Sequence, residues 1–198
     1  MNDNTIAVLE RLTAASLEKC LLRLSRVSAG TWQILGINIS TGTAAGAIKQ
    51  HDFTNQAAAV YFNLGSGPAL TMIMLFDPTE IECISKGFTG HSFPRGERTT
   101  PAEEITLMEL GNIVMNALAN SVLNALNKTS FPALPEYIEG DSDALIKELG
   151  AITDLNREYR VIKATLAIRC DNNVANSEVF ALIPLELASI LERATPPQ

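Results

Sequence analysis

Cysteine and histidine are scarce in this chain. The 198 residues include three widely spaced cysteines, Cys20, Cys83 and Cys170, and no Cys-x-x-Cys pair. This number and spacing indicate neither a disulfide framework nor a zinc site. The two histidines, His51 and His91, stand alone, and we expect them at the surface rather than as metal ligands. The sequence therefore predicts no metal site of its own.

Basic charge and long apolar runs are also lacking. The chain has 15 Lys and Arg against 22 Asp and Glu, a net charge of -7, and no basic cluster, which argues against nucleic-acid binding. No apolar run approaches the roughly 18 residues that span a bilayer. The start, Met1 to Asn4, lacks the basic region of a signal peptide. We expect a soluble, reduced, cytoplasmic protein with no membrane insertion.

Apolar spacing divides the chain into helices and strands. The second long helix has the clearest start, because Thr100, Pro101 and Glu103 form a capping box with proline at the first helical position. The turn 65–68 joins two strands into a hairpin, and 88–99 reads as irregular. The expected helices cover 5–25, 78–86, 101–127, 143–149 and 184–193, and the expected strands cover 32–39, 57–64, 69–76, 159–170 and 177–183.

This order of elements repeats after about 100 residues. Leu9-Glu10 in a helix followed by strands is echoed by Met108-Glu109, and the passage from a strand into Pro78 is echoed at Pro184. We therefore expect one domain over 1–198, built from pseudo-repeats at about 5–90 and 100–195. The residues alone allow an α+β sheet with helices on one side or a three-layer sandwich.

Amides follow one face of the second long helix. Asn is a poor helix former, so a stripe of amides that opens with one carboxylate differs from an ordinary solvated face of Glu and Lys. Three interpretations are open: a partner-facing surface, an exposed helix that happens to carry Asn, or an interior helix whose amides bond to neighbouring elements. The stripe consists of Glu109, Asn112, Asn116, Asn120, Asn124 and Asn127.

The run Leu107 to Leu118 resembles the signature helix of the CheC/CheX/FliY phosphatases of bacterial chemotaxis. The family motif is Asp or Ser, three residues, Glu, two residues, Asn, then twenty-two residues to Pro, and Glu109, Asn112 and Pro135 fit this spacing. The resemblance extends along the chain, to the hairpin before Pro78 and to the last strand and helix. It implies an α+β, CheC-like, pseudo-twofold duplicated αβ domain, with an antiparallel sheet and two long helices on one side.

The resemblance also implies a function. The substrate would be the aspartyl phosphate of a CheY-type response regulator, which would carry the Mg²⁺, so that this chain would need no cofactor. Asn112 would orient the attacking water, and Glu109 would pair with a lysine of the regulator. Gly111 and Asn116 would belong to the binding surface, with Gly111 leaving room for the partner's backbone, and Pro135 would shape the turn after the helix.

The chain departs from the family pattern at two places. Ile105 stands at the Asp/Ser position, which removes any hydrogen bond from there. In the first helix, Glu10 aligns with the motif Glu, but Thr13 stands where Asn is needed, so we expect an inactive first half and one site per chain.

Two alternatives remain open from the sequence. One is a non-catalytic module that binds a response regulator or acts as a flagellar-switch-like scaffold, and the other is a regulator that binds the deamidase CheD. Arg95 and Arg98, before the second long helix, either contact an acidic regulator surface or form a basic loop.

Overall fold

The computed structural model describes residues 3–64, 70–93 and 99–193. The predicted turn at 65–68, Arg95, Arg98 and the C-terminal tail lie outside these residues. The helices are α1 (Asp3–Val27), α2 (Ala44–Ile48), α3 (Ile81–Thr89), α4 (Pro101–Ala125), α5 (Ser142–Leu149) and α6 (Leu185–Arg193), and the 3₁₀ turn η1 (Pro78–Glu80) precedes α3. The strands are β1 (Thr31–Thr43), β2 (Ala57–Leu64), β3 (Leu70–Phe76), β4 (Glu136–Gly140), β5 (Glu158–Cys170) and β6 (Asn173–Pro184).

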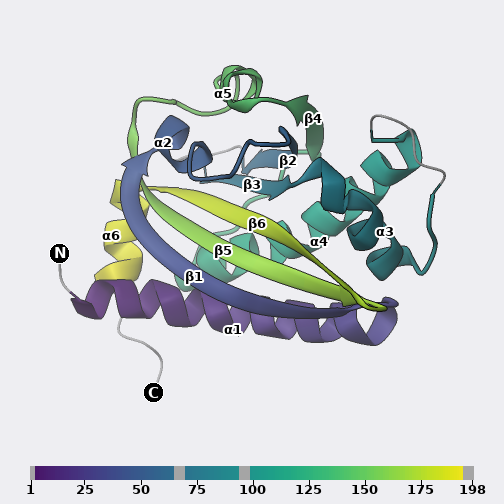
Figure 1. Cartoon of the computed structure of the whole chain (residues 1–198). Helices are drawn as coiled ribbons and strands as arrows, with labels where there is room; N and C mark the ends of the chain where they lie inside the picture. Colours follow the sequence, from purple (N-terminus) through teal and green to yellow (C-terminus); the bar gives the residue numbers. More distant parts are fainter. Residues whose placement is uncertain (1–2, 65–69, 94–98, 194–198) are drawn as a thin grey trace.

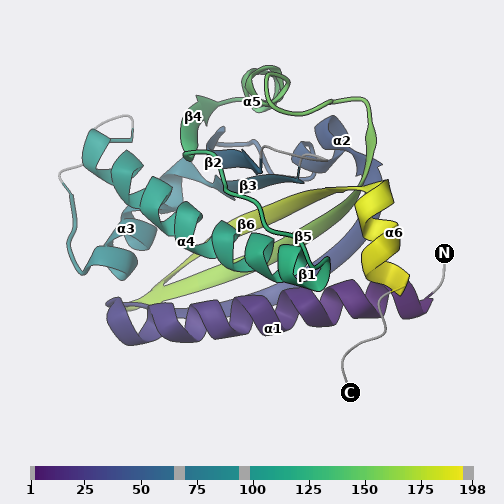
Figure 2. The same cartoon turned by 180° about the vertical axis from the view of Figure 1, so that it is seen from behind.

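The six strands of the described chain form one antiparallel sheet in the order β1-β5-β6-β3-β2-β4. Helices α1, α3, α4 and α6 pack on one face, where the larger apolar core lies (Figures 1 and 2). Helices α2 and α5 cover one end of the other face, where a second core lies. The predicted fold class, an antiparallel sheet with two long helices on one side, is confirmed.

The sheet order is symmetric between the two halves of the chain. When each strand of the first half (β1, β2, β3) is exchanged for its counterpart in the second (β4, β5, β6), the same order is read in reverse. Helices α1 and α4 each have 25 residues and begin 98 residues apart, at Asp3 and Pro101. The N-caps of α2 and α5, Thr43 and Asp141, are also 98 residues apart. The pseudo-twofold arrangement is therefore built into the topology, while the repeat limits and the single-domain assignment stay predictions.

Local chemistry explains where α4 begins. The backbone N–H of Glu103 donates to Thr100 Oγ1 (3.3 Å), and the backbone N–H of Thr100 donates to Glu103 Oε2 (2.8 Å), which completes the predicted capping box. Asn127 ends the helical region in the left-handed conformation, with φ of 51°. Both ends of the helix that carries the motif are thus fixed by short-range contacts.

Two elements were missed by the sequence prediction. Strand β4 lies in the stretch expected to be a connection, because its sequence is short and charged, and it forms only by pairing with β2 at the edge of the sheet. Helix α2 is a single turn capped by Thr43, too short for a periodic signal. None of the helices in the described residues combines the length and the apolar character needed to span a bilayer.

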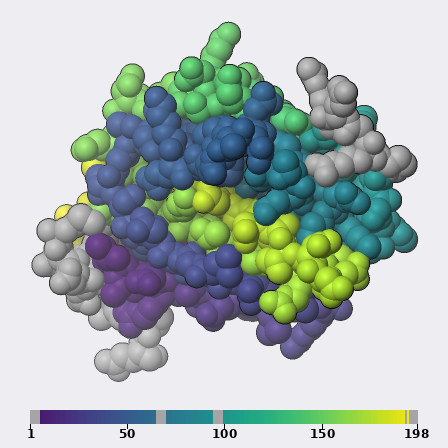
Figure 3. Space-filling view, in the orientation of Figure 1, coloured from purple at the N-terminus to yellow at the C-terminus, as the bar shows by residue number. Residues whose placement is uncertain are grey.

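A polar cluster lies on the face of the sheet that carries α2 and α5, just beyond the end of α2. Yellow-green atoms of β5 and β6 reach the surface between the blue segments of the first half (Figure 3). Here His51 Nδ1 lies 2.8 Å from Glu178 Oε2, and Lys163 Nζ lies 2.6 Å from Glu178 Oε1. Only 9% of the His51 side chain is exposed, so the expectation of a surface histidine was wrong for His51, whereas His91 is exposed.

We expect this cluster to make stability depend on pH at acidic values. Burial opposes ionisation of Glu178, but hydrogen bonds from His51 and Lys163 outweigh it and hold the pKa below its ordinary value of 4.5. A depressed folded pKa stabilises the protein above pH 4.5 and loses that effect as pH falls through the folded pKa. Urea unfolding should show Glu178→Gln to be about 1–2 kcal/mol less stable at pH 7. The difference should shrink as pH falls below 4.5 and through the lowered folded pKa. The exposed-site control Glu10→Gln should match wild type across the same pH range, and an unchanged difference at low pH would contradict the assignment.

Candidate functional site

Helix α4 presents a polar face that opens with Glu109. Glu109 is exposed, and Asn112 and Asn116 are half-buried on the same side. One turn before Glu109, Ile105 occupies the Asp/Ser position of the motif, and it is 64% exposed although it is apolar. A carboxylate and an amide three residues apart, beside an exposed isoleucine, therefore share one accessible surface.

A hydrogen bond within the helix holds the amide of Asn112. Asn116 Nδ2 donates to Asn112 Oδ1 over 2.7 Å, between residues one turn apart. An amide oxygen has two lone pairs, so Oδ1 keeps one acceptor position, and the Asn112 NH₂ group keeps its donors. The side chain of Asn112 is thus fixed in orientation while it retains hydrogen-bonding capacity toward solvent.

Gly111 faces the sheet and not the solvent. A Cβ at this position would lie 2.9 Å from Cγ1 and 3.1 Å from Cβ of Val60 on β2, closer than packed carbons tolerate. The close approach that glycine permits is therefore between α4 and β2 of this chain. The structure gives Gly111 a packing role in place of the expected contact with a partner's backbone.

The first half of the chain carries different residues at the matching positions. With the 98-residue offset between the long helices, Glu109 corresponds to Arg11, Gly111 to Thr13 and Asn112 to Ala14. Buried positions then coincide along the two helices, Leu9 with Leu107, Thr13 with Gly111, and Leu17 with Met115.

This offset corrects the sequence alignment of the first helix by one residue. Thr13 is fully buried and matches Gly111, so it is not the counterpart of Asn112. Glu10 is exposed, as expected, but matches Met108. Neither a carboxylate nor an amide stands at the two positions of α1 that correspond to Glu109 and Asn112.

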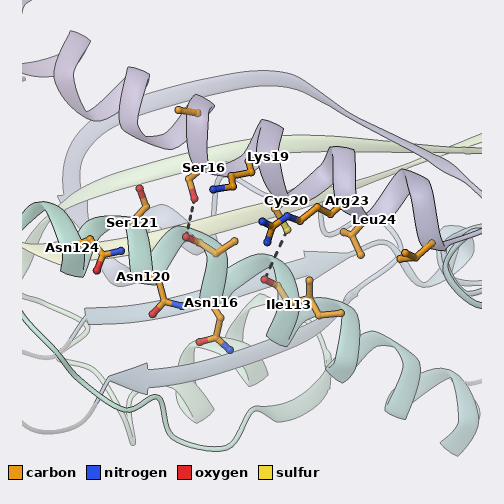
Figure 4. A pocket seen from close by; sticks show the side chains of 13 residues that line it. Ser16, Lys19, Cys20, Arg23, Leu24, Ile113, Asn116, Asn120, Ser121 and Asn124 are labelled. Carbon is orange, nitrogen blue, oxygen red and sulfur yellow. Dashed lines mark hydrogen bonds between the residues drawn. The ribbon is translucent and has the colours of Figure 1, made fainter. Parts of the chain in front are cut away.

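A groove runs between α1 and α4. The sequence pointed to its α4 wall through the amide stripe, three of whose members (Asn116, Asn120 and Asn124) line the groove, but it gave no signal for the α1 wall. The volume of the groove is about 720 Å³, and its floor is closed by hydrogen bonds in which Ser16 Oγ donates to the carbonyl of Ala117 (2.8 Å) and Cys20 Sγ to that of Ile113 (3.9 Å) (Figure 4). Burial raises the pKa of the Cys20 thiol, and Arg23 offsets this only in part, so the thiol stays neutral. Its walls are formed by Ala15, Ser16, Lys19, Cys20, Arg23, Leu24 and Val27 of α1 and by Ile113, Asn116, Ala117, Asn120, Ser121 and Asn124 of α4.

The remaining motif residue lies outside α4, in the connection to β4. Pro135 is half-buried and directly precedes β4. Before it, the connection pairs with the end of β2, where Leu64 bridges Pro132 and the N–H of Ala133 donates to the carbonyl of Asn63. This position suits the expected role in shaping the chain after the helix. Within the described residues, no group of three or more His, Cys, Asp or Glu side chains could hold a metal ion.

Solved structures identify the fold. FliY from Thermotoga maritima aligns with a TM-score of 0.69 at 12% identity, over 96% of this chain and 95% of that one. A chain of the FliG–FliM complex from H. pylori aligns with a TM-score of 0.65 at 14% identity, over 98% of this chain and 100% of that one. A CheC-like superfamily protein from Shewanella sp. PV-4 aligns with a TM-score of 0.50 at 14% identity, over 91% of this chain and 99% of that one.

The chain has a CheC/CheX/FliY-like fold. No protein-family model matches the sequence, and no curated protein matches it. The likeness therefore concerns the fold, and function must be argued from the residues that the fold places at its surface.

We expect Gly111→Ala to destabilise the protein by about 1 kcal/mol. The clash with Val60 should cost about 1–3 kcal/mol, against a gain of about 1 kcal/mol in helix propensity. Chemical denaturation should show the loss, and in a Val60→Ala background Gly111→Ala should become neutral or stabilising. Equal effects of Gly111→Ala in both backgrounds would show that Val60 is not what the glycine accommodates.

Proposed function

We propose that this protein is a phosphatase that hydrolyses the aspartyl phosphate of a CheY-type response regulator in bacterial chemotaxis, at one site on α4. The observation that carries the proposal is that Glu109 and Asn112 reach solvent on one face of a helix, with the amide of Asn112 held by Asn116. The CheC/CheX/FliY-like fold supports it, since the motif lies on a long helix of that fold. The corresponding positions in α1 carry Arg11 and Ala14, so we propose a single site per chain.

In the proposed reaction no residue of this chain forms a covalent bond to the substrate. The water oxygen attacks phosphorus in line, the bond from phosphorus to the aspartyl oxygen breaks, and inorganic phosphate and the free carboxylate leave. The water oxygen stays on phosphorus as a hydroxyl group, and the other proton of the water passes to a phosphate oxygen or to solvent. Phosphoryl transfer depends mainly on positioning and charge compensation. The regulator would supply the Mg²⁺ and a lysine, so this chain would need no cofactor of its own.

Each residue of the motif has a separate role in this proposal. Asn112 accepts a hydrogen from the water at the free acceptor position of Oδ1 and so holds the water in line with phosphorus. Glu109 pairs with the lysine of the regulator and sets how the two proteins dock. Pro135 shapes the chain that follows the helix and takes no part in the chemistry.

Asn116 acts as a positioning residue in this scheme. Its N–H to Asn112 Oδ1 decides which way the Asn112 amide is turned, because the two heads of an amide are similar in shape and differ only in hydrogen bonding. Without this bond the amide is free to turn, and the water loses its fixed acceptor. The binding role predicted for Asn116 becomes, in this proposal, a role in orienting Asn112.

A non-catalytic role is the second candidate, and Ile105 favours it. An isoleucine that is 64% exposed beside Glu109 suits burial against a partner protein more than water-mediated chemistry. A chain of the FliG–FliM complex shares the fold, and the alignment covers nearly the whole of both chains. In this alternative the face of α4 binds a response regulator or a flagellar-switch component without hydrolysis. Binding of CheD would be a further form of it.

The first test is dephosphorylation of phosphorylated CheY-type regulators by wild type and by Asn112→Ala. We expect the mutant to lose about 100-fold of the acceleration, because a displaced water removes in-line attack. Asn120→Ala is the matched control, since Asn120 is exposed on the same face two turns later, and it should retain activity. Acceleration that survives Asn112→Ala would place the chemistry elsewhere. Binding of the regulator without acceleration by wild type would support the scaffold alternative.

The second test separates positioning from binding. Asn116→Ala should lower the rate constant of the bound complex by about 10-fold and leave the affinity for the phosphorylated regulator nearly unchanged. Asn116→Gln, which retains an amide on a longer side chain, should recover part of the rate. Both constants come from single-turnover measurements at varied concentration of the phosphatase. Loss of affinity with an unchanged rate constant would instead make Asn116 a docking residue.

A further inference from the structure

The groove between α1 and α4 is basic on one wall, in a chain with a net charge of -7. Lys19 and Arg23 are exposed on α1, four residues apart, and both line the groove (Figure 4). Among the residues that the structure describes, neither forms an ion pair. Two exposed cations that line the same groove, neither paired within the described part of the chain, offer complementarity to a negatively charged partner.

The α4 wall of the groove adds hydrogen-bond donors, and exposed apolar side chains lie beside them. Asn116, Asn120 and Asn124 line the α4 side, and their amide NH₂ groups add hydrogen-bond donors opposite the cations. Apolar side chains complete the groove, and among them Val27 is 82% exposed and Ile113 42% exposed. The groove therefore suits a partner that has one apolar face with carboxylates at its sides.

The backbone of the groove favours a helix over an extended segment. Both walls are α-helices, whose interior N–H and C=O groups are already paired, so an extended peptide would find no free sheet edge to join. A helix pairs its own backbone groups and needs only side-chain contacts. The lining of α1 runs from Ala15 to Val27, a length of about 18 Å, which accommodates about three turns of helix.

We propose that this groove docks an acidic amphipathic helix of a partner protein. The apolar face of that helix lies against Val27 and Ile113, and its carboxylates pair with Lys19 and Arg23 and accept hydrogen bonds from the amides of α4. The hydrogen bonds from Ser16 and Cys20 to the α4 backbone hold α1 and α4 together at the floor of the groove. The docked helix therefore lies on the surface of this helix pair and does not insert between the two helices. This proposal does not depend on phosphatase activity, because it uses neither Glu109 nor Asn112.

The test uses two fluorescent peptides of about four helical turns, with leucines on one face. One peptide carries glutamate on its polar face and the other carries lysine. Fluorescence anisotropy should show the glutamate peptide binding to the full chain about tenfold or more tightly than the lysine peptide, with affinity falling as salt is raised. Equal affinity of the two peptides, or no binding of the glutamate peptide at about 1 mM, overturns the proposal.

Charge reversal locates the binding. The double variant Lys19→Glu/Arg23→Glu should bind the glutamate peptide at least about tenfold more weakly than wild type. Lys49→Glu/Lys147→Glu makes the same change in net charge at two exposed positions away from the groove, the C-cap of α2 and a residue of α5, and should bind as wild type does. Circular dichroism establishes that both variants are folded. Equal losses in the two variants would mean that net charge, and not the groove, attracts the peptide.

Discussion

The contact between Gly111 and Val60 decides how α4 lies on the sheet, and the rest of the site depends on it. Successive residues of a helix are rotated by about 100°, so fixing Gly111 toward β2 turns Glu109 to the opposite side and leaves Asn112 and Asn116 on the outer half. With a larger residue at 111, the helix would have to rise from the sheet or rotate. Either movement would shift the carboxylate and the amide together, because both belong to the same rigid element. The helix propensity given up at Gly111 is thus offset by packing that aims the polar face outward.

The matching positions of α1 carry side chains that cannot perform the chemistry proposed for Glu109 and Asn112. Thr13 takes the place of Gly111 and is fully buried, so α1 accommodates a side chain where α4 accommodates none. Arg11 and Ala14 then occupy the surface positions of Glu109 and Asn112. The duplicated topology therefore offers two equivalent surfaces, and the difference between them lies in single side chains, not in the backbone. This is why pseudo-twofold symmetry of the sheet does not imply two sites.

Residues that act through short-range rules could be predicted from the sequence. The capping box at Thr100, the periodic apolar faces of the long helices and the spacing of Glu109 and Asn112 all depend on neighbours within a few positions. What depended on distant contacts was missed or misplaced: β4 exists through pairing with β2, His51 pairs with Glu178, and Gly111 packs against Val60. The groove was missed for the same reason, since its two walls lie about 100 residues apart in the chain. The alignment of Thr13 with Asn112 was off by one residue, because the apolar pattern of two helices does not by itself fix which residues correspond. The buried positions of α1 and α4 fix the correspondence.

Asn116 belongs to both surfaces of α4, and this has a thermodynamic consequence. Its amide donates to Asn112 Oδ1 and also lines the groove, so its orientation enters the free energy of both. A helix seated in the groove that accepts a hydrogen from the second N–H of Asn116 would favour the same amide orientation that holds Asn112. Linkage is reciprocal: if the occupant favours that orientation, the orientation favours the occupant by the same free energy. One side chain between two surfaces is therefore enough to couple them, with no movement of the backbone of α4.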